Sequence, residues 1–243
     1  MNSAPKTSLL SVIVPTMNEA HNVVPLAQQI SDTLATVTPY EIIYVDDSTD
    51  DTPQVLAKLS EQNPATIRYL HRNHNTGLAR AVVDGFAMAR GDVLAVIDGD
   101  LQHPPCLLST MFREIQSGAD VVLPSRYTES EKSEGLNVIR QTISSGAKRL
   151  GNLFIPELRS ITDPTGGYFM LRSAVIADKD LKPIGWKILV EVMALGNYDM
   201  VVEVPYEFSQ RNADQSKMDL KASLQYLLHL ISLEARRMRK DWQ

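Results

Sequence analysis

The stretch DVLAVIDGDLQHPPCLLSTMFREIQSG, residues 92–118, shows the pattern that decides the fold of this chain. A continuous apolar run is followed by a polar turn, and Leu108, Met111 and Ile115 then recur at helical spacing up to Gly118. Strands that are apolar at every position suit a sheet covered on both faces. The stretch therefore predicts one strand–helix unit of a layered α/β protein.

The same unit repeats along the first half of the chain. Apolar runs LLSVIV, YEIIYV, TIRYL, DVLAVI and DVVLP begin at residues 9, 40, 66, 92 and 120. Between them, Thr52 and Pro53 are typical of a helix start. Helical stripes are formed by Val23, Leu26, Ile30 and Leu34, by Val55, Leu56 and Leu59, and by Leu78, Val82, Phe86 and Ala89. This alternation predicts a doubly wound, mostly parallel sheet.

Composition narrows the function classes. With 243 residues, 44% of them hydrophobic and 22% charged, the chain fits one main globular domain with an appendage. A net charge of -5 argues against a nucleic-acid surface. The single Cys106 excludes an internal disulfide and a cysteine zinc site, and we expect it in a helix core. The N-terminus lacks the pattern of a signal peptide, and no apolar run is long enough to span a bilayer.

Polar clusters follow each of the first four predicted strands. They are PTMNE at 15–19, DDSTDD at 46–51, HRNHNTG at 71–77 and DGD at 98–100. In a parallel sheet all four lie at the carboxyl edge, where open α/β sheets bind their ligands. The sequence therefore predicts a site at this edge.

Asp98 and Asp100 form the sharpest chemical signal within these clusters. Two carboxylates separated by one glycine can reach a common point, and Mg²⁺ typically takes one or two carboxylates together with substrate phosphates. Gln102 offers a further oxygen. The alternative is a turn in which an aspartate caps the helix that follows two prolines.

The second strand ends in Asp46 and Asp47, a position where an acid commonly bonds a ribose or a base edge. For Asp50 and Asp51 we prefer simple helix capping. No G-x-G-x-x-G follows the first strand and no G-x-x-x-x-G-K-[ST] occurs, so the phosphate loops of a dehydrogenase and of an NTPase are both missing.

From residue 125 the sequence no longer alternates apolar strands with helices and becomes polar. SRYTESEKSEG, residues 125–135, predicts a loop, and the stretch to residue 154 predicts a helix with an apolar stripe. On a neighbouring face, Arg140, Ser144 and Lys148 are spaced by four and suit a phosphate. The alternative is a solvated helix face. The apolar stripe consists of Ile139, Ile143, Ala147, Leu150 and Phe154.

The C-terminal stretch, residues 218–243, predicts an amphipathic helix with a basic tail, appended to a main domain at 1–217. Such a helix can lie on an anionic membrane surface, and the alternative is a helix packed on the core with a solvated tail. Its apolar stripe is Leu220, Leu224, Leu227, Ile231 and Ala235, and its basic residues are Arg236, Arg237, Arg239 and Lys240.

The motifs PTMNE, VDDSTDDT, RNHNTGLARAVVDGFAMARGD, DGDLQHPP, SRY, DPTGGYF and GWKILVEV occur in order from about Ser11 to Lys217. Together they resemble the family 2 glycosyltransferases, and within them the dolichyl- or polyprenyl-phosphate mannosyltransferase branch. The resemblance implies a GT-A fold, a nucleotide-sugar donor and Mg²⁺ or Mn²⁺ as the cofactor.

The resemblance also implies roles for single residues. The metal ligands would be Asp98, Asp100 and Gln102; the nucleotide side would be formed by Pro15, Glu19, Asp46, Asp47, Asp98, Arg211 and Lys217; the catalytic residues would be Asp100, Arg126 and Arg140; and the acceptor phosphate would meet Arg126, Arg140 and Ser144. Lys217 belongs to a Ser-Lys pair that the family has near the acceptor site. Two departures occur: Gly99 stands where alanine is usual, which we expect to matter little, and RNADQSK lacks a glycine after its arginine.

The implied reaction is an inverting transfer of a hexose, mannose from GDP-mannose, to dolichyl or polyprenyl phosphate. The Q-x-x-R-W signature of chain-building synthases is absent, which favours a phosphate acceptor. Two alternatives stay open: a polyprenyl-phosphate glucosyltransferase that uses UDP-glucose, and a non-catalytic scaffold that binds a nucleotide sugar. We expect a cytoplasmic chain that is peripheral at a membrane face, with a possible membrane-anchoring subunit and no nucleic-acid partner.

Overall fold

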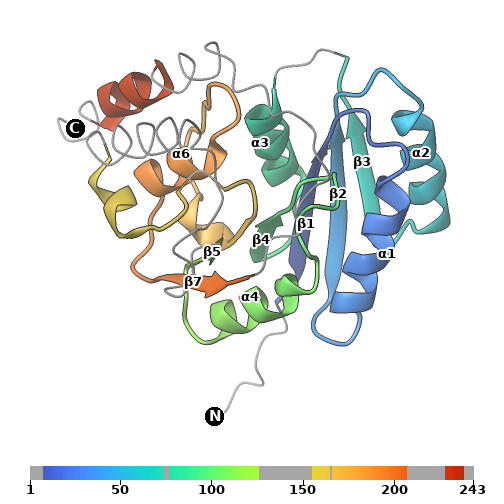
Figure 1. The fold of residues 1–243 in the computed structure, drawn as a ribbon, viewed down its shortest axis with the longest axis horizontal. Coiled ribbons are helices and arrows are strands. Elements are labelled where there is room, and N and C mark those ends of the chain that lie inside the picture. The colour runs from blue at the N-terminus through green and yellow to red at the C-terminus, as the bar shows by residue number, and fades with distance from the viewer. Residues whose placement is uncertain (1–7, 74–76, 126–154, 165, 207–227, 238–243) are drawn as a thin grey trace, which may run out of the picture.

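The computed structural model describes residues 8–73, 77–125, 155–164, 166–206 and 228–237, which form a seven-stranded sheet with helices on both faces (Figure 1). The strand order is β3-β2-β1-β4-β6-β5-β7. The strands are β1 (Leu10–Thr16), β2 (Tyr40–Asp46), β3 (Ile67–His71), β4 (Val93–Val96), β5 (Val121–Ser125), β6 (Phe169–Arg172) and β7 (Val201–Pro205).

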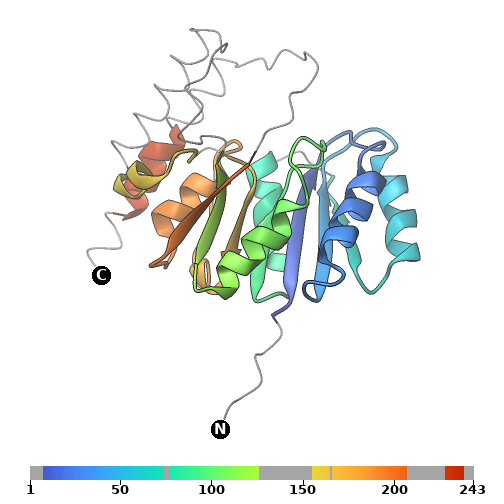
Figure 2. The ribbon, with the colours of Figure 1, turned by 60° about the horizontal axis from the view of Figure 1, so that its bottom comes forward.

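Helices cover the two faces of the sheet (Figures 1 and 2). Helices α1, α2 and α4 pack on one face, and α3, α6 and the 3-10 helix η1 pack on the other. The α-helices are α1 (Val23–Leu34), α2 (Thr52–Gln62), α3 (Leu78–Met88), α4 (Leu107–Gln116) and α6 (Ile188–Leu195); the 3-10 helices are η1 (Pro156–Ser160) and η2 (Ser173–Val175). None of the helices among the described residues is both long and apolar enough to cross a bilayer.

The prediction of a mostly parallel α/β sheet is confirmed. β1 pairs in parallel with β2 and with β4, and β2 pairs in parallel with β3. The four polar clusters therefore follow strands that end at the same edge. β6 was not predicted: it lies between β4 and β5 and pairs antiparallel to both. Its run FMLR is too short to stand out from the sequence around it.

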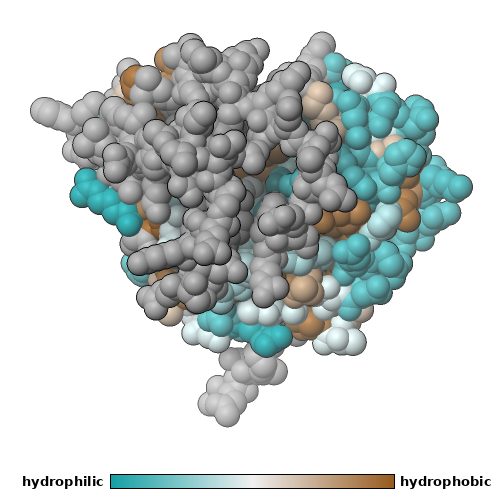
Figure 3. All heavy atoms as spheres, in the orientation of Figure 1, coloured by the Kyte–Doolittle hydropathy of each residue, from teal (hydrophilic) through white to brown (hydrophobic). Residues whose placement is uncertain are grey.

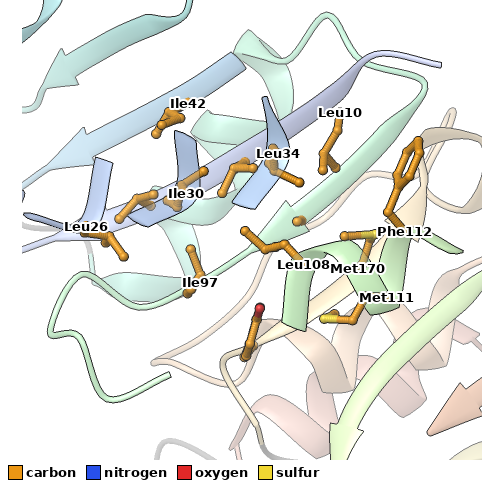
Figure 4. Packing of buried hydrophobic residues seen from close by; sticks show 14 of the residues in the cluster. Leu10, Leu26, Ile30, Leu34, Ile42, Ile97, Leu108, Met111, Phe112 and Met170 are labelled. Atoms are coloured by element: carbon orange, nitrogen blue, oxygen red, sulfur yellow. The ribbon is translucent and has the colours of Figure 1, made fainter. Parts of the chain in front are cut away.

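Two apolar clusters fill the space on either side of the sheet. Figure 4 shows part of the first, in which side chains of α1 and α4 pack against β1, β2 and β6. The predicted stripe of α1 is fully buried there, as is that of α4. Outside this cluster, the surface over α1 and α2 is mostly hydrophilic, with scattered apolar atoms (Figure 3).

The predicted stripe of α3 is only partly right. Val82 is buried, but Leu78 is 36% exposed and the buried face also includes Ala79 and Gly85. A Cβ at Gly85 would lie 2.4 Å from Cγ2 of Ile13, so the glycine lets α3 approach β1 closely. Leu78 is the first residue of the helix and lies at the surface.

Two local predictions also change at helix starts. α2 begins at Thr52, one residue before the expected position, with Asp51 as its N-cap. The Asp51 side chain makes no capping hydrogen bond, whereas Asp50 accepts hydrogen bonds from the backbone N–H and the hydroxyl of Thr52. Cys106 is exposed at the N-cap of α4, so the expectation of a core cysteine is wrong. The helix begins after this residue, and its buried face begins at Leu108.

Residues 228–237 are helical and pack on the second cluster. Leu230 and Leu233 are fully buried, whereas Ile231 is 49% exposed. Of the predicted apolar stripe, Ile231 and Ala235 are exposed rather than packed on the core, and Leu220, Leu224 and Leu227 lie outside the described residues. Arg236 and Arg237 are paired with Glu191 and Glu157 rather than solvated.

Candidate active site

The ends of β1, β2 and β3 are joined by a row of hydrogen bonds centred on Asp46. Thr16, Asp46 and His71 are register partners on the three neighbouring strands. Asp46 is fully buried and accepts from the Thr16 hydroxyl at 3.2 Å, from Ser48, and from His71 Nδ1 at 2.7 Å. The row fixes the last residue of each strand, and it places the His71 ring, whose side chain is 34% exposed, at the rim of the edge.

The neighbouring Asp47 forms a second layer with Arg72. Arg72 Nε donates to Asp47 Oδ1 at 2.6 Å, and its Nη1 donates to Asp84 of α3 at 2.9 Å. Burial alone would lower the pKa of Arg72, but the hydrogen bonds to Asp47 and Asp84 outweigh it and raise the pKa. The guanidinium therefore stays charged and holds Asp47 in one orientation.

The loop after β1 is tied to the loop after β2. The backbone N–H of Asn18 donates to Ser48 Oγ at 2.7 Å, and the Asn18 side chain accepts from the backbone N–H of Thr49. Asn18 has φ 61°, a left-handed conformation that asparagine tolerates better than most residues. The backbone N–H of Glu19 donates to the Thr52 hydroxyl at 3.0 Å. These bonds hold the carboxyl end of β1 against the start of α2.

The DGD turn packs against this same loop. A Cβ at Gly99 would lie 2.9 Å from Thr16 Cγ2 and 3.3 Å from the Pro15 carbonyl oxygen. In this chain the Thr16 methyl fills the space that an alanine would need, so the neighbours would have to shift to accept one. That the glycine matters little to the metal motif stays a prediction. Asp100 Oδ1 accepts from the backbone N–H of Gln102 at 3.0 Å. Asp98 faces His103 Nε2 at 3.3 Å, and its side chain is 28% exposed.

The donor set at this turn suits a hard divalent cation. Asp98, Asp100 and Gln102 supply carboxylate and amide oxygens directly after β4. No three His, Cys, Asp or Glu side chains of the described residues converge as a ligand set on their own. Mg²⁺ and Mn²⁺ sites of nucleotide enzymes commonly complete their ligands with substrate phosphate oxygens, so two carboxylates fit that pattern.

Comparison with known proteins now decides the family. The model of the family described as "Glycosyl transferase family 2" matches residues 11–179, more than half of the chain. The chain belongs to this family. The matched residues of this family 2 glycosyltransferase include both the loop after β1 and the DGD turn.

Two relatives place this family 2 glycosyltransferase in the dolichol-phosphate mannosyltransferase branch. It is 40% identical over 225 residues to the dolichol-phosphate mannosyltransferase of Pyrococcus furiosus, covering 92% of this chain and 63% of that relative. It is 32% identical over 243 residues to the enzyme of the same name from Mycosarcoma maydis, covering 95% of this chain and 81% of the relative. The chain thus spans less than two thirds of the length of the Pyrococcus protein.

Solved structures show the same GT-A type of fold. Glucosyl-3-phosphoglycerate synthase from Mycobacterium tuberculosis, in complex with Mn²⁺, UDP-glucose and phosphoglyceric acid, superimposes with a TM-score of 0.70 at 19% identity, covering 94% of this chain and 80% of that one. Mannosyl-3-phosphoglycerate synthase from Rubrobacter xylanophilus gives a TM-score of 0.67 at 22% identity, covering 96% and 75%. These likenesses confirm the expected fold.

Of the predicted site residues, the structure brings together those at the carboxyl edge. Pro15 lies near the end of β1, Glu19 lies in the loop after β1 and Asp47 directly follows β2; these segments are hydrogen-bonded to one another, and Gly99 of the acidic turn packs against Pro15. Asp46 needs correction as a direct ligand contact: its carboxylate is fully buried and surrounded by protein donors, because it joins the strand ends. The predicted residues Arg126, Arg140, Ser144, Arg211 and Lys217 lie outside the described residues.

Sequence reasoning missed the residues that orient the acids. Arg72 and His71 stand in a cluster that had been noted only for its position, and His103 stands inside the acidic motif itself. The position of Arg72, directly after the third strand and across from the two acids that end the second, is a signal from which its role could have been predicted. His103 gave no such signal, since its contact with Asp98 depends on how the turn folds back.

Proposed function

We propose that this family 2 glycosyltransferase transfers mannose from GDP-mannose to dolichyl or polyprenyl phosphate, with inversion at the anomeric carbon. The observation that carries the proposal is the packing of the DGD turn against Pro15 and Thr16. If Asp98 and Asp100 bind a cation as we propose, this contact brings them beside the loop that we expect to hold the nucleotide. The names of the two relatives supply the acceptor class and the sugar.

The acceptor needs little chemical help. A phosphate monoester is ionised near neutral pH, so its own oxygen attacks C1 of the sugar and no general base is required. The new C1–O bond forms on one face as the C1–O bond to the diphosphate breaks on the other, and GDP leaves. The protein's task is therefore to position two anions and offset their charge. By resemblance, Arg126, Arg140 and Ser144 would meet the acceptor phosphate, and Arg211 and Lys217 would belong to the nucleotide side of the site.

On the donor side, Asp98, Asp100 and Gln102 would hold Mg²⁺ or Mn²⁺. A divalent cation supplies positive charge that offsets the negative charge building on the leaving diphosphate. Arg72 keeps Asp47 oriented toward the nucleotide side through two hydrogen bonds. Support for a metal also comes from the Mycobacterium structure, which was solved with Mn²⁺.

A transfer assay with purified protein tests the proposal. GDP-mannose and UDP-glucose, each radiolabelled in the sugar, are incubated with dolichyl phosphate and Mn²⁺, and the organic phase is counted. We expect label in the lipid from GDP-mannose and its loss when EDTA is added. Label from UDP-glucose alone would transfer the assignment to the glucosyl branch, and no label from either donor would contradict an enzyme.

The scaffold alternative is separated by comparing binding with turnover. Calorimetric titration with GDP and with UDP, each with and without Mn²⁺, reports the nucleotide and its dependence on metal. A scaffold would bind nucleotide sugar without turnover, whereas the proposed enzyme binds GDP in a metal-dependent manner and turns over. Asp98 and Asp100 favour the enzyme, because simple binding has no chemical need for a pair of acids beside a diphosphate.

We also propose a peripheral position at the cytoplasmic face of a membrane, with a membrane-anchoring subunit as a possible partner. The support is the outer face of the helix at 228–237, where Leu228 and Ile231 are each about half exposed. Co-sedimentation with vesicles containing anionic lipid tests this, with Ile231→Glu as the variant. We expect the variant to stay in the supernatant, and equal sedimentation of both proteins would contradict this part of the proposal.

A further inference from the structure

His103 links the first acid of the DGD turn to the strand at the far end of the sheet. Its Nε2 lies 3.3 Å from Asp98 Oδ2, and its Nδ1 lies 3.3 Å from the hydroxyl of Tyr206, directly after β7. Only 12% of the His103 side chain is exposed. The imidazole is therefore held between two polar partners in a nearly closed space.

Aromatic rings fix the plane of this histidine. Its ring centroid lies 5.2 Å from that of Tyr168 and 6.1 Å from that of Tyr206, with tilted planes. Tyr168 is 3% exposed, and its hydroxyl donates to the Pro104 carbonyl at 3.4 Å. The residue after the histidine is thus tied to the same tyrosine, which restricts how His103 can turn.

The partners assign the ring hydrogens of His103. An ionised carboxylate only accepts, so Nε2 carries the hydrogen that points at Asp98. Nδ1 then accepts from the Tyr206 hydroxyl. The chain of donors runs from Tyr206 to His103 and on to Asp98, an arrangement that orients ligating carboxylates in other metal proteins.

Gly167 bounds the other side of the same carboxylate. A Cβ at this position would lie 2.9 Å from Asp98 Oδ2 and 3.0 Å from Oδ1. Gly167 precedes β6, whose antiparallel direction brings its first residues to the end of β4. The Asp98 carboxylate is therefore bracketed by His103 and by a position that has no room for a side chain.

We propose that His103, braced by Tyr206, and Gly167 are positioning residues that set the orientation of Asp98 for the divalent cation. The proposal rests on the proposed metal-dependent function. Both act through Asp98, which each of them adjoins. Loss of a hydrogen bond behind a metal ligand typically weakens metal affinity about 10- to 100-fold.

The test measures Mn²⁺ affinity in the presence of GDP by electron paramagnetic resonance of free Mn²⁺. We expect His103→Leu to bind Mn²⁺ about 10- to 100-fold more weakly than wild type. His103→Gln keeps an N–H donor near the Nε2 position, and we expect its affinity within a few-fold of wild type. Tyr206→Phe keeps the ring and loses the hydroxyl, which should give an intermediate loss. Thermal unfolding of each variant reports whether the fold is retained.

Two adjacent glycines supply a matched pair of variants. A Cβ at Gly166 would have no atom closer than 3.7 Å, so Gly166→Ala should bind Mn²⁺ like wild type. Gly167→Ala should weaken Mn²⁺ binding about tenfold, because the methyl group displaces the Asp98 carboxylate. The comparison removes the general effect of a stiffer loop, which both variants share.

The outcomes separate this proposal from the proposed function. Wild-type protein that binds Mn²⁺ and GDP, with His103→Leu binding equally well, overturns the positioning role and leaves the function standing. Equal losses in His103→Leu and His103→Gln overturn it too, since the donor would then be irrelevant. Wild-type protein that binds no Mn²⁺ with GDP contradicts the metal-dependent function, and the positioning role falls with it.

Discussion

Glu41 and Asp98 are acids at opposite edges of the same sheet, and their surroundings differ. Glu41, at the start of β2, accepts from the Ser11 hydroxyl at 2.7 Å, the Arg90 backbone N–H at 2.8 Å and Arg68 at 3.1 Å, and its side chain is 5% exposed. Asp98, after β4, is 28% exposed and faces His103. One acid is enclosed by donors of the protein, and the other is oriented by them while still reaching solvent.

The difference separates structural acids from chemical ones. Burial alone would raise the pKa of Glu41, but hydrogen bonds from Ser11, Arg90 and Arg68 outweigh it, and the pKa is lowered. Glu41 is therefore ionised and committed to joining the amino ends of the strands to the turn after α3. At the carboxyl edge, the contact with His103 orients the Asp98 carboxylate without enclosing it, which leaves its oxygen atoms accessible for the ligand role that we propose.

The largest effect on the transfer rate is expected when an acid at the carboxyl edge is removed. Asp100→Asn should lower the rate of mannosyl transfer by about 100- to 1000-fold, since stabilisation of charge on a leaving diphosphate is worth several kcal/mol. The unfolding temperature should stay within a few degrees of wild type. Steady-state transfer assays and thermal unfolding check both parts, and an unchanged rate would remove Asp100 from the metal site.

The matching change at the amino edge should act on stability. Glu41→Ala leaves the Ser11 hydroxyl, the Arg90 N–H and Arg68 without their acceptor, and we expect a loss of about 3 kcal/mol in the free energy of unfolding. At a temperature where the variant is folded, the transfer rate should equal that of wild type. Urea unfolding measures the first quantity. A Glu41→Ala variant that is as stable as wild type but slow in transfer would contradict the structural role of Glu41.

Glu191 is a buried acid like Glu41, but it has a histidine, His229, beside it. His229 accepts from the Ile184 N–H at 3.0 Å and lies 3.7 Å from Glu191, and burial, reinforced by Arg236, lowers its pKa from 6.5 to about 4. The unfolded chain binds a proton near pH 6.5 and the folded chain resists it. The stability contributed by the neutral ring is therefore complete above pH 6.5 and is lost as the pH falls toward 4.

We expect the free energy of unfolding to fall by about 2 kcal/mol between pH 6.5 and pH 4.5 because of this group. His229→Asn keeps an acceptor for Ile184 and cannot titrate, so it should lack this part of the pH dependence. Burial raises the pKa of Glu191, which acts in the opposite direction and is present in both proteins. Parallel pH profiles for wild type and variant would refute the assignment to His229.

The smallest expected effect tests how closely the loops meet at the carboxyl edge. Gly99→Ala should weaken binding of GDP with Mn²⁺ about fivefold, or about 1 kcal/mol, because the new methyl group meets the Thr16 methyl. Adding Thr16→Ser removes that methyl and keeps the hydroxyl that bonds Asp46, so binding should recover. Failure of the double variant to recover would show that the turn is disturbed in some other way.

The sequence predicted the parallel half of the sheet because its strands are apolar throughout and end in polar clusters. It also predicted that these clusters lie at one edge, since parallel strands end together. It could not predict β6, whose four residues look like any short apolar run, or the close approach of Gly85 to Ile13.

Within the site, the limit lies in contacts between residues far apart in the chain. The carboxylates Asp98 and Asp100 were visible from their spacing. The burial of Asp46 was not, because it follows from three partners on separate segments. The contact of His103 with Tyr206 joins positions 103 residues apart, and no local pattern announces it.

The reversed direction of β6 has a consequence for how the length of this chain can vary. The chain enters β6 at the edge where Asp98 lies, with Gly167 against that carboxylate, and leaves it at the opposite edge, where the Ser173 N–H donates to the Asp92 carbonyl. Residues added before Phe169 would therefore displace Gly167 from Asp98 and alter the proposed donor site. Residues added after Arg172 would lengthen a connection beside Asp92, at the edge of the sheet opposite Asp98. We expect such an insertion to leave the transfer rate unchanged.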